Sequence, residues 1–222
     1  DGYPLDSTFL SDATTTTSTA NNGVGVGVAG GRVGFRLNED GVGFNVTSHV
    51  LPDLGAGPRQ GFEATFKYYM AATGIPADGF AFNLGNPAST NGGEEGFADG
   101  LAVGFNLYSY NGHKVLVDGV AGSLNPQDPF VNGQWHDVVI RWERLATSNG
   151  ELTLKVDGQV IFDKVPTSGF NPAATDRFAF TSRTGFYMAD ILIDDVSVRP
   201  LFSLPLDPGP LLIRRLPNVD PD

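Results

Sequence analysis

The sequence predicts an all-β protein built as a two-sheet antiparallel sandwich. Apolar and polar residues alternate in many short segments, and turn-forming residues separate these segments at intervals of about 8–12 residues. The 29 glycines and 15 prolines are spread along the chain as turn punctuation. No apolar period typical of a helix extends beyond about two or three turns. Many short strands are therefore expected.

Residues 1–200 are expected to form one domain, since all-β units of this length commonly share a single core. Within it, residues 1–31 form a loosely specified N-terminal region, because residues 11–31 are rich in Thr, Asn and Gly. Residues 201–222 contain several prolines, which lack the N–H that a central strand needs. This last segment is interpreted as a tail or an interdomain linker.

Regular alternation begins at Arg32. Apolar residues occupy every second position from Val33 to Leu37 and again from Val42 to Val46, on either side of an Asn-Glu-Asp-Gly turn. This pattern predicts a hairpin over residues 32–46.

Further alternating segments predict the remaining strands. They lie at residues 62–69, 80–84, 101–108, 114–117, 135–142, 152–156, 160–162, 176–181 and 191–198. A Ser-Asn-Gly turn ends at Gly150, and Asp157-Gly158 separates two of the segments. An Asp-Gly pair between alternating segments is a strong signal of a hairpin.

Composition excludes several classes of function. The formal net charge of −11, from 25 acidic and 14 basic side chains, would repel a phosphate backbone, and no Lys/Arg stripe opposes it. Without cysteine, the chain has no disulfides and no thiolate ligands or nucleophiles. No apolar run approaches the ~20 residues of a membrane helix, and the first residues lack the pattern of a signal peptide. A mature or excised soluble piece is expected.

Three segments together carry a family resemblance: residues 75–82, which include Ala77-Asp78-Gly79, residues 100–108 and residues 178–185. With them, the chain resembles the legume-type, concanavalin-A-like lectins and their bacterial relatives. The Trp-His-Asp-Val segment from Trp135 and the closing strand also resemble laminin-G-type jelly rolls. The resemblance covers most of residues 32–199 and implies a concanavalin-A-like jelly roll that binds sugar.

The resemblance also implies a set of sugar-binding residues. Asp78 matches the aspartate that accepts hydrogen bonds from two adjacent sugar hydroxyls, and such charge-assisted bonds are short and directional. Gly93, in Asn91-Gly92-Gly93, matches the backbone donor, and Asn106 or Asn111 would supply an amide. The residues themselves leave open that Asp78 only caps the turn before its strand.

The loop after Gly185 lines the sugar site in this family, which maps onto Phe186, Tyr187 and Met188. An exposed ring of Phe186 or Tyr187 would stack on the apolar face of a pyranose. Packing of at least one of these side chains into the core is the alternative.

The family's metal pattern is incomplete. Legume lectins hold a transition metal and calcium through a Glu-x-Asp pair followed by further ligands; here those two positions are Gly104 and Asn106, with Tyr108 kept. Losing anionic ligands weakens a divalent site, so a two-metal site is not expected. The sequence leaves open a site for a single calcium ion. Its candidate ligands are Asp78, Asn106, the carbonyl of Tyr108, and Asn111 or Asp99.

Other polar residues receive structural interpretations. His113 is interpreted as an exposed turn histidine and His136 as a structural residue at a strand start. Glycoside hydrolases need two facing carboxylates about 5–9.5 Å apart. Glu94 and Glu95 are adjacent and are interpreted as solvated acids, as are Asp190 and Asp194 in the closing strand. No catalytic residues are therefore expected.

The leading hypothesis is a non-catalytic carbohydrate-binding domain of a larger secreted or cell-surface protein, bacterial in origin, with a glycan or polysaccharide as partner. It depends on a carboxylate of Asp78 that faces solvent at the rim of the sandwich. A structural or adhesive protein-interaction module on the same fold is the alternative, and a polysaccharide-degrading enzyme is the third reading.

Overall fold

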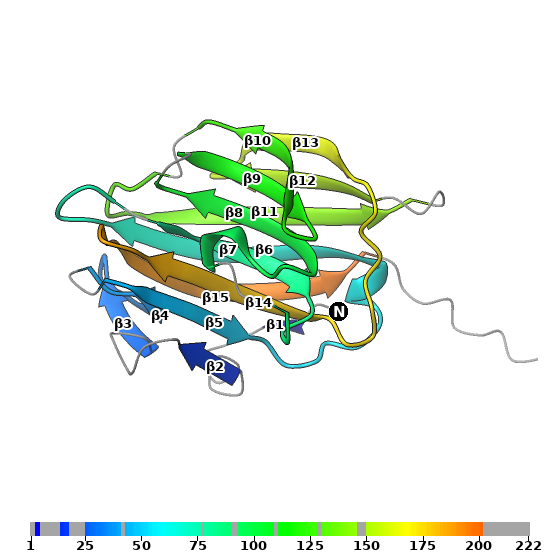
Figure 1. Cartoon of the computed structure of the whole chain (residues 1–222), viewed down its shortest axis with the longest axis horizontal. Helices are drawn as coiled ribbons and strands as arrows, with labels where there is room; N and C mark the ends of the chain where they lie inside the picture. The colour runs from blue at the N-terminus through cyan, green and yellow to red at the C-terminus, as the bar shows by residue number, and fades with distance from the viewer. Residues whose placement is uncertain are drawn as a thin grey trace, which may run out of the picture.

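The computed structural model describes residues 3–4, 14–17, 25–40, 43–76, 78–89, 93–108, 111–127, 130–145 and 150–201. Two antiparallel sheets face one another across this part of the chain (Figure 1), which confirms the predicted sandwich. None of the helices in these described ranges has the length and apolar character that crossing a membrane requires. Most of the predicted N-terminal region and nearly all of the predicted tail, residues 202–222, lie outside the described residues.

One sheet, here sheet A, contains eight strands among the described residues. In spatial order they are β13 (Gln159–Thr167), β12 (Gly150–Val156), β11 (Trp135–Arg144), β6 (Gly61–Ala71), β15 (Asp190–Pro200), β4 (Arg32–Asn38) and β3 (Gly25–Ala29), with β1 (Tyr3–Pro4) also paired to β15.

The other sheet, sheet B, contains seven strands within the same described ranges. Their order is β10 (Val120–Asn125), β9 (Gly112–Val117), β8 (Gly100–Asn106), β7 (Gly79–Gly85), β14 (Arg177–Thr184), β5 (Asn45–Val50) and β2 (Thr14–Thr17). Two short 3-10 helices, η1 (Pro58–Gln60) and η2 (Gly93–Glu95), lie in the connections.

The Asp-Gly hairpin is confirmed. Asp157 and Gly158 have φ of 49° and 76° and join β12 to β13, as a mirror-image turn between right-twisted strands requires. Asp118-Gly119 joins β9 to β10 with the same conformation. Like the first turn, this second turn has the Asp-Gly sequence that favours a hairpin.

The hairpin predicted over residues 32–46 is wrong. β4 belongs to sheet A and β5 to sheet B, so the chain crosses from one layer to the other between them. β4 instead forms a hairpin with β3, across Gly30-Gly31. Phe35 and Leu37 of β4 lie in the core, and the ring of His49 of β5 packs against that of Phe35 from the opposite layer, with centroids 3.9 Å apart. Alternation alone does not distinguish this arrangement from a hairpin.

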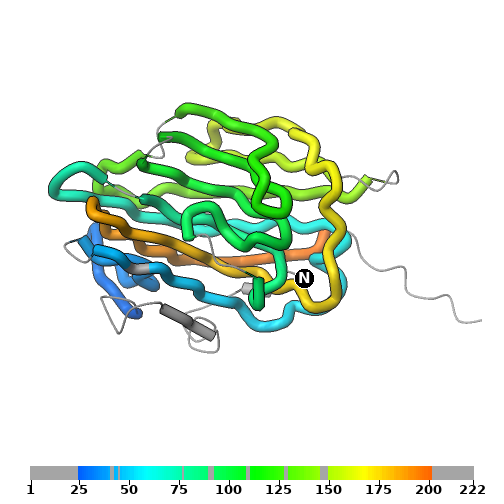
Figure 2. The backbone as a smooth tube through the Cα atoms, viewed as in Figure 1, coloured from blue at the N-terminus to red at the C-terminus, as the bar shows by residue number. Residues whose placement is uncertain are grey.

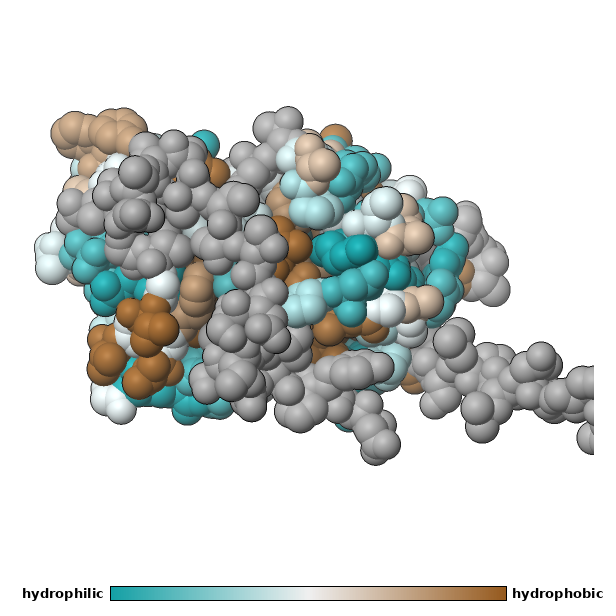
Figure 3. Space-filling model, turned by 90° about the horizontal axis from the view of Figure 1, so that it is seen from below, coloured by the Kyte–Doolittle hydropathy of each residue, from teal (hydrophilic) through white to brown (hydrophobic). Residues whose placement is uncertain are grey.

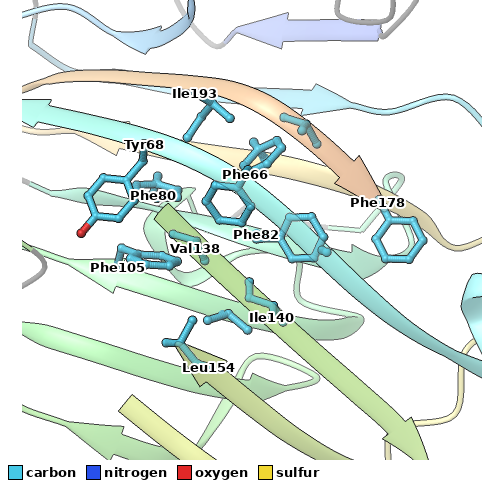
Figure 4. Close-up of a cluster of buried hydrophobic side chains, with 14 of the residues drawn as sticks. Phe66, Tyr68, Phe80, Phe82, Phe105, Val138, Ile140, Leu154, Phe178 and Ile193 are labelled. Carbon is cyan, nitrogen blue, oxygen red and sulfur yellow. The ribbon is translucent and has the colours of Figure 1, made fainter. Parts of the chain in front are cut away.

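Large aromatic side chains from both sheets fill the space between the layers (Figure 4). Phe66 of β6 packs edge-on against Phe180 of β14, with ring centroids 5.0 Å apart, and Phe80 stacks on Phe105 at 4.4 Å. Trp142 is fully buried and donates from Nε1 to Thr167 Oγ1 at 2.9 Å. This core holds the two sheets at a fixed separation.

The connection between β7 and β8 folds over the outer face of sheet B, where it crosses β7 in Figure 1. The backbone N–H of Phe97 donates to Asn83 Oδ1 at 3.1 Å, and Thr181 Oγ1 donates to the carbonyl of Gly93 at 2.6 Å. Beneath it lie Ala81 and Ala102, both buried. The connection therefore holds η2 against the sheet.

The hairpin of β3 and β4 leaves three valines exposed: Val26, Val28 and Val33. Seen from below, an apolar patch lies at the end of the molecule where these two strands lie (Figure 3). The segments that leave β4, β6, β8 and β14 gather at the same end, on the left in Figure 2.

Candidate functional site

An open pocket of about 440 Å³ lies where these segments meet. Its walls come from the start of β5, the start of β7, the segment after β8 and the end of β14 with its following loop. The lining residues are Phe44, Val46, Asp78, Tyr108, Arg183, Thr184, Gly185, Phe186 and Tyr187.

Aromatic rings dominate the rim of this pocket. Phe44, Tyr108 and Phe186 are 70%, 48% and 77% exposed, which is unusual for large apolar side chains. The ring of Tyr187 lies 5.6 Å from that of Tyr108 and 5.8 Å from that of Phe186. Phe44 is fixed by its backbone N–H, which donates to the carbonyl of Gly185 at 3.1 Å. The rim thus offers flat apolar surfaces to a ligand.

Asp78 forms the polar wall of the pocket and is held on both sides. Its Oδ2 accepts a hydrogen bond from Arg183 Nε at 2.9 Å, and its backbone N–H donates to the carbonyl of Arg183 at 3.1 Å. Its own carbonyl accepts from the N–H of Leu107 at 2.8 Å. Asp78 is therefore anchored between β14, through its carboxylate and its N–H, and the segment after β8, through its carbonyl.

This geometry corrects the expectation of a freely solvated carboxylate, because only 7% of the Asp78 side chain is exposed. β14 pairs with β7 so that Arg183 lies opposite Gly79, which brings the guanidinium beside Asp78. Burying an ionised carboxylate costs free energy, and such a counter-charge offsets part of that cost. Among the described residues no hydrogen bond reaches Oδ1, and the side chain still lines the pocket.

Glu94 shares the same arginine. Its Oε1 lies 2.9 Å from Arg183 Nη2, and its side chain is also 7% exposed, so the interpretation of Glu94 as a solvated acid is wrong. Burial raises the pKa of Glu94 to about 7, against the attraction of Arg183 and with the repulsion of Asp78 and Glu95. Burial acts to lower the pKa of Arg183, but the carboxylates outweigh it and this pKa is raised.

Glu95 pairs with a different cation. Lys114 Nζ of β9 lies 2.5 Å from Glu95 Oε1, and the same oxygen accepts from Asn106 Nδ2 at 3.3 Å. The adjacent acids of η2 are therefore paired with cations from two different strands.

The remaining predicted sugar-binding residues lie outside the pocket wall. Gly93 is buried as the first residue of η2, Asn106 is buried with its amide directed at Glu95, and Asn111 is exposed just before β9. Asn91 and Gly92 lie outside the described residues. Asp78, Tyr108, Phe186 and Tyr187 are the predicted residues that the fold brings together.

The candidate calcium ligands do not fit a divalent ion. Asp78 already contacts a guanidinium, and Asn106 lies next to a carboxylate that Lys114 neutralises. Asp99 precedes β8, at the opposite end of that strand from Asn106. Within the ranges that the structure describes, no group of three or more His, Cys, Asp or Glu side chains could hold a metal. A cation at Asp78 would lie beside a fixed positive charge.

His113 and His136, the two histidines interpreted from the sequence, lie in different environments. His113 is fully buried, with its ring edge-on to Phe105 at 5.1 Å, so the expectation of an exposed turn histidine is wrong. His136 is structural as expected: its Nδ1 lies 2.6 Å from Asp157 Oδ2 and its Nε2 lies 2.9 Å from Asn132 Oδ1.

Sequence reasoning missed Arg183, Glu94 and Phe44 as parts of this site. A signal existed for Arg183, a charged residue in the otherwise apolar or small segment from Phe178 to Gly185. Its partners lie far away in the sequence, so their identity required the strand register.

Solved structures share this architecture. The exoplasmic/lumenal domain of VIP36, in a form bound to Ca²⁺ and Man, matches with a TM-score of 0.63 and 16% identity over 86% of this chain and 84% of that one. Lectin I-B4 from Griffonia simplicifolia matches with a TM-score of 0.58 and 15% identity over 84% and 98%. Lectin UEA-II, complexed with galactose, matches at 0.60 and 13% over 85% and 92%.

No protein-family model matches the sequence, and no curated protein matches it. At these identities the structural matches show the fold: the chain has the concanavalin-A-like sandwich common to legume-type lectins and VIP36.

Proposed function

We propose that this chain is a non-catalytic, lectin-like module that binds a glycan in the pocket beside Asp78. The solvent-facing carboxylate on which the sequence-based hypothesis depended is not found, since Asp78 is 7% exposed and paired with Arg183. The observation that carries the proposal is instead the cluster of exposed aromatic rings around the pocket that Asp78 lines. Sugar rings have apolar faces that stack on aromatic side chains and hydroxyls that donate to carboxylates. The presence of the same sandwich in proteins solved with mannose and galactose supports this choice of ligand.

In this proposal a pyranose lies against Phe186, Tyr187 or Tyr108, and its hydroxyls reach Oδ1 of Asp78 and the outward edge of Arg183. Arg183 orients the carboxylate, so the acceptor does not have to be ordered when the sugar arrives. The pocket is shallow and open, so monovalent affinity is expected to be weak, and multiple copies would supply useful binding.

The aromatic rim offers the sharpest test. Phe186→Ala and Tyr108→Ala remove exposed rings, so glycan binding should fall about tenfold or more while the melting temperature stays unchanged. Val120→Ala is a matched control, because Val120 is also exposed but lies on β10, on the far side of β9 and β8 from β7 and Asp78. Binding is measured on glycan arrays with multivalent protein. Absence of any glycan ligand, with or without calcium, would overturn the proposal.

The internal pairing of Asp78 favours a second candidate, a structural or adhesive protein-interaction module. If the Asp78–Arg183 ion pair serves only the fold, the rim aromatics would contact a protein instead of a sugar. A protein partner whose binding is lost in Phe186→Ala, together with an empty glycan array, would support this candidate.

We further propose that the module is secreted or displayed on a cell surface as part of a larger protein. Residues 1–200 would act as one domain and residues 201–222 as a tail or linker to a neighbour. We expect no turnover of polysaccharides, since Asp78 and Glu94 share one guanidinium. Release of reducing sugars from a polysaccharide panel would contradict this expectation.

A further inference from the structure

We propose that two cationic side chains, Arg183 and Lys114, organise the loops around the pocket. They would neutralise the carboxylates there, as a divalent metal ion would do. The proposal concerns the order of the loops, and its test uses no sugar. Its failure and the failure of the glycan-binding proposal are therefore distinguishable.

Arg183 joins three separate parts of the chain. It belongs to β14, its Nε donates to Asp78 just before β7, and its Nη2 contacts Glu94 of η2, both at 2.9 Å. The two carboxylates are almost fully buried, whereas 46% of the arginine side chain is exposed. One guanidinium thus connects the β6–β7 segment, the β7–β8 connection and the end of β14, using its fork of donors.

Lys114 forms the corresponding ion pair with Glu95, the other glutamate of η2. It lies on β9 opposite Gly104 of β8, and its ammonium contacts Glu95 at 2.5 Å. Only 12% of the Lys114 side chain is exposed. The carboxylate that it neutralises also accepts from Asn106, which ties η2 to the end of β8.

The order of strands in sheet B shows what the two ion pairs achieve together. β9 and β14 flank β8 and β7, and η2 contacts both of the inner strands. The two adjacent glutamates of η2 therefore pair with cations on the strands to either side of it. Together these two ion pairs hold the β7–β8 connection against sheet B.

Charge explains why a metal ion is not needed in this arrangement. Asp78, Glu94 and Glu95 contribute three carboxylates around η2, and carboxylate oxygens are the ligands that a hard cation prefers, but among the described residues these three do not form a group that could hold one ion. Arg183 and Lys114 already contact all three. A divalent ion would have to displace a guanidinium or an ammonium that is held by the fold.

The wild-type protein tests the proposal directly. Its melting temperature is measured in EDTA and in millimolar CaCl₂ or MnCl₂ at matched ionic strength. We expect no change, because a ligand that binds only the folded state raises the melting temperature by an amount that grows with the logarithm of its concentration above the dissociation constant. A rise of about 3 °C or more that increases with cation concentration would overturn the proposal.

Variants of the arginine test its role. Arg183→Gln should lower the melting temperature by about 5 °C or more, because the buried carboxyl groups of Asp78 and Glu94 lose their guanidinium partner. Calcium should then restore part of that loss, a response that a merely structural residue would not create. Arg183→Lys should be intermediate, and Glu94→Gln added to Arg183→Gln should recover stability without calcium.

Arg141→Gln is the matched control. Arg141 is exposed to a similar extent, 48%, and pairs with Glu143 on its own strand, away from the pocket. Its melting temperature should change by about 1 °C or less and should not respond to calcium. If Arg183→Gln behaves like Arg141→Gln, the proposal is overturned. If Arg183→Gln does not fold, the cation titration of the wild type still decides.

Discussion

Glu94 shows how strongly burial changes the pKa of a single carboxyl group. One carboxylate oxygen contacts Arg183, while the other, Oε2, is buried with no partner among the described residues. Because desolvation of the charged form exceeds the attraction of the guanidinium, the pKa of Glu94 is raised to about 7 from 4.5. The neutral carboxyl is the form that the folded protein prefers near pH 6.

A pH dependence of stability follows from this raised pKa. Between pH 4.5 and about pH 7 the folded protein binds a proton at Glu94 that the unfolded chain has released. The contribution of Glu94 to the free energy of unfolding should therefore fall as pH rises through this window, by up to about 3 kcal/mol. Urea unfolding of the wild type and of Glu94→Gln from pH 5 to 7.5 measures it, and the free energy of the wild type minus that of the variant should fall with pH.

The comparison with Glu94→Gln is necessary because His49 titrates in the opposite sense. Burial lowers the pKa of His49 to about 4, so its contribution to stability grows with pH up to about 6.5. Only the difference between the two proteins isolates Glu94. Identical slopes in both would show that Glu94 is ionised in the fold throughout.

At the scale of elements, the β7–β8 connection depends on close approach to the sheet beneath it. A Cβ at Gly96 would lie 2.1 Å from Asn83 Oδ1 and 2.5 Å from the Cβ of Ala102, closer than atoms can come. The connection can lie flat on sheet B only because this residue has no side chain. The position of η2, and with it Glu94 and Glu95, follows from that contact.

Gly96→Ala should therefore displace the connection, and Gly158→Ala is the matched control. Both glycines have positive φ, 82° and 76°, so both variants carry a backbone cost of about 1 kcal/mol. Only Gly96 also meets neighbouring atoms, which should add about 2 kcal/mol or more. Urea denaturation gives the two losses, and equal losses would contradict the close contact.

At the scale of the whole molecule, stability depends on aromatic side chains that join the two layers. Phe66 of sheet A contacts four rings of sheet B, those of Phe80, Phe82, Phe105 and Phe180, at centroid distances of 5.0–6.4 Å. Neither sheet can bury its apolar face without the other. The domain is therefore expected to unfold as one cooperative unit.

Phe66→Ala should lower the free energy of unfolding by about 3–5 kcal/mol, because the cavity left among these rings cannot collapse. Fluorescence and near-UV circular dichroism should report the same single transition. Val120→Ala, at an exposed position, should change stability by no more than about 0.5 kcal/mol. A loss below about 1 kcal/mol in Phe66→Ala would show that the two layers are held together in another way.

The sequence by itself determined the strands and their tight turns, because alternation and the Asp157-Gly158 pair act between near neighbours in the chain. The family resemblance also pointed to Asp78 and to the aromatic loop after Gly185. It did not determine the sheet that each strand joins, which is why the hairpin over residues 32–46 was wrong.

Only the tertiary structure decided the character of the site. Arg183 lies 105 residues from Asp78, and their ion pair exists because β14 aligns with β7 in one particular register. The burial of Glu94 likewise requires the β7–β8 connection to lie on a sheet whose strands come from distant segments. Burial and charge pairing depend on everything that surrounds a residue in space, and a linear pattern contains no record of those neighbours.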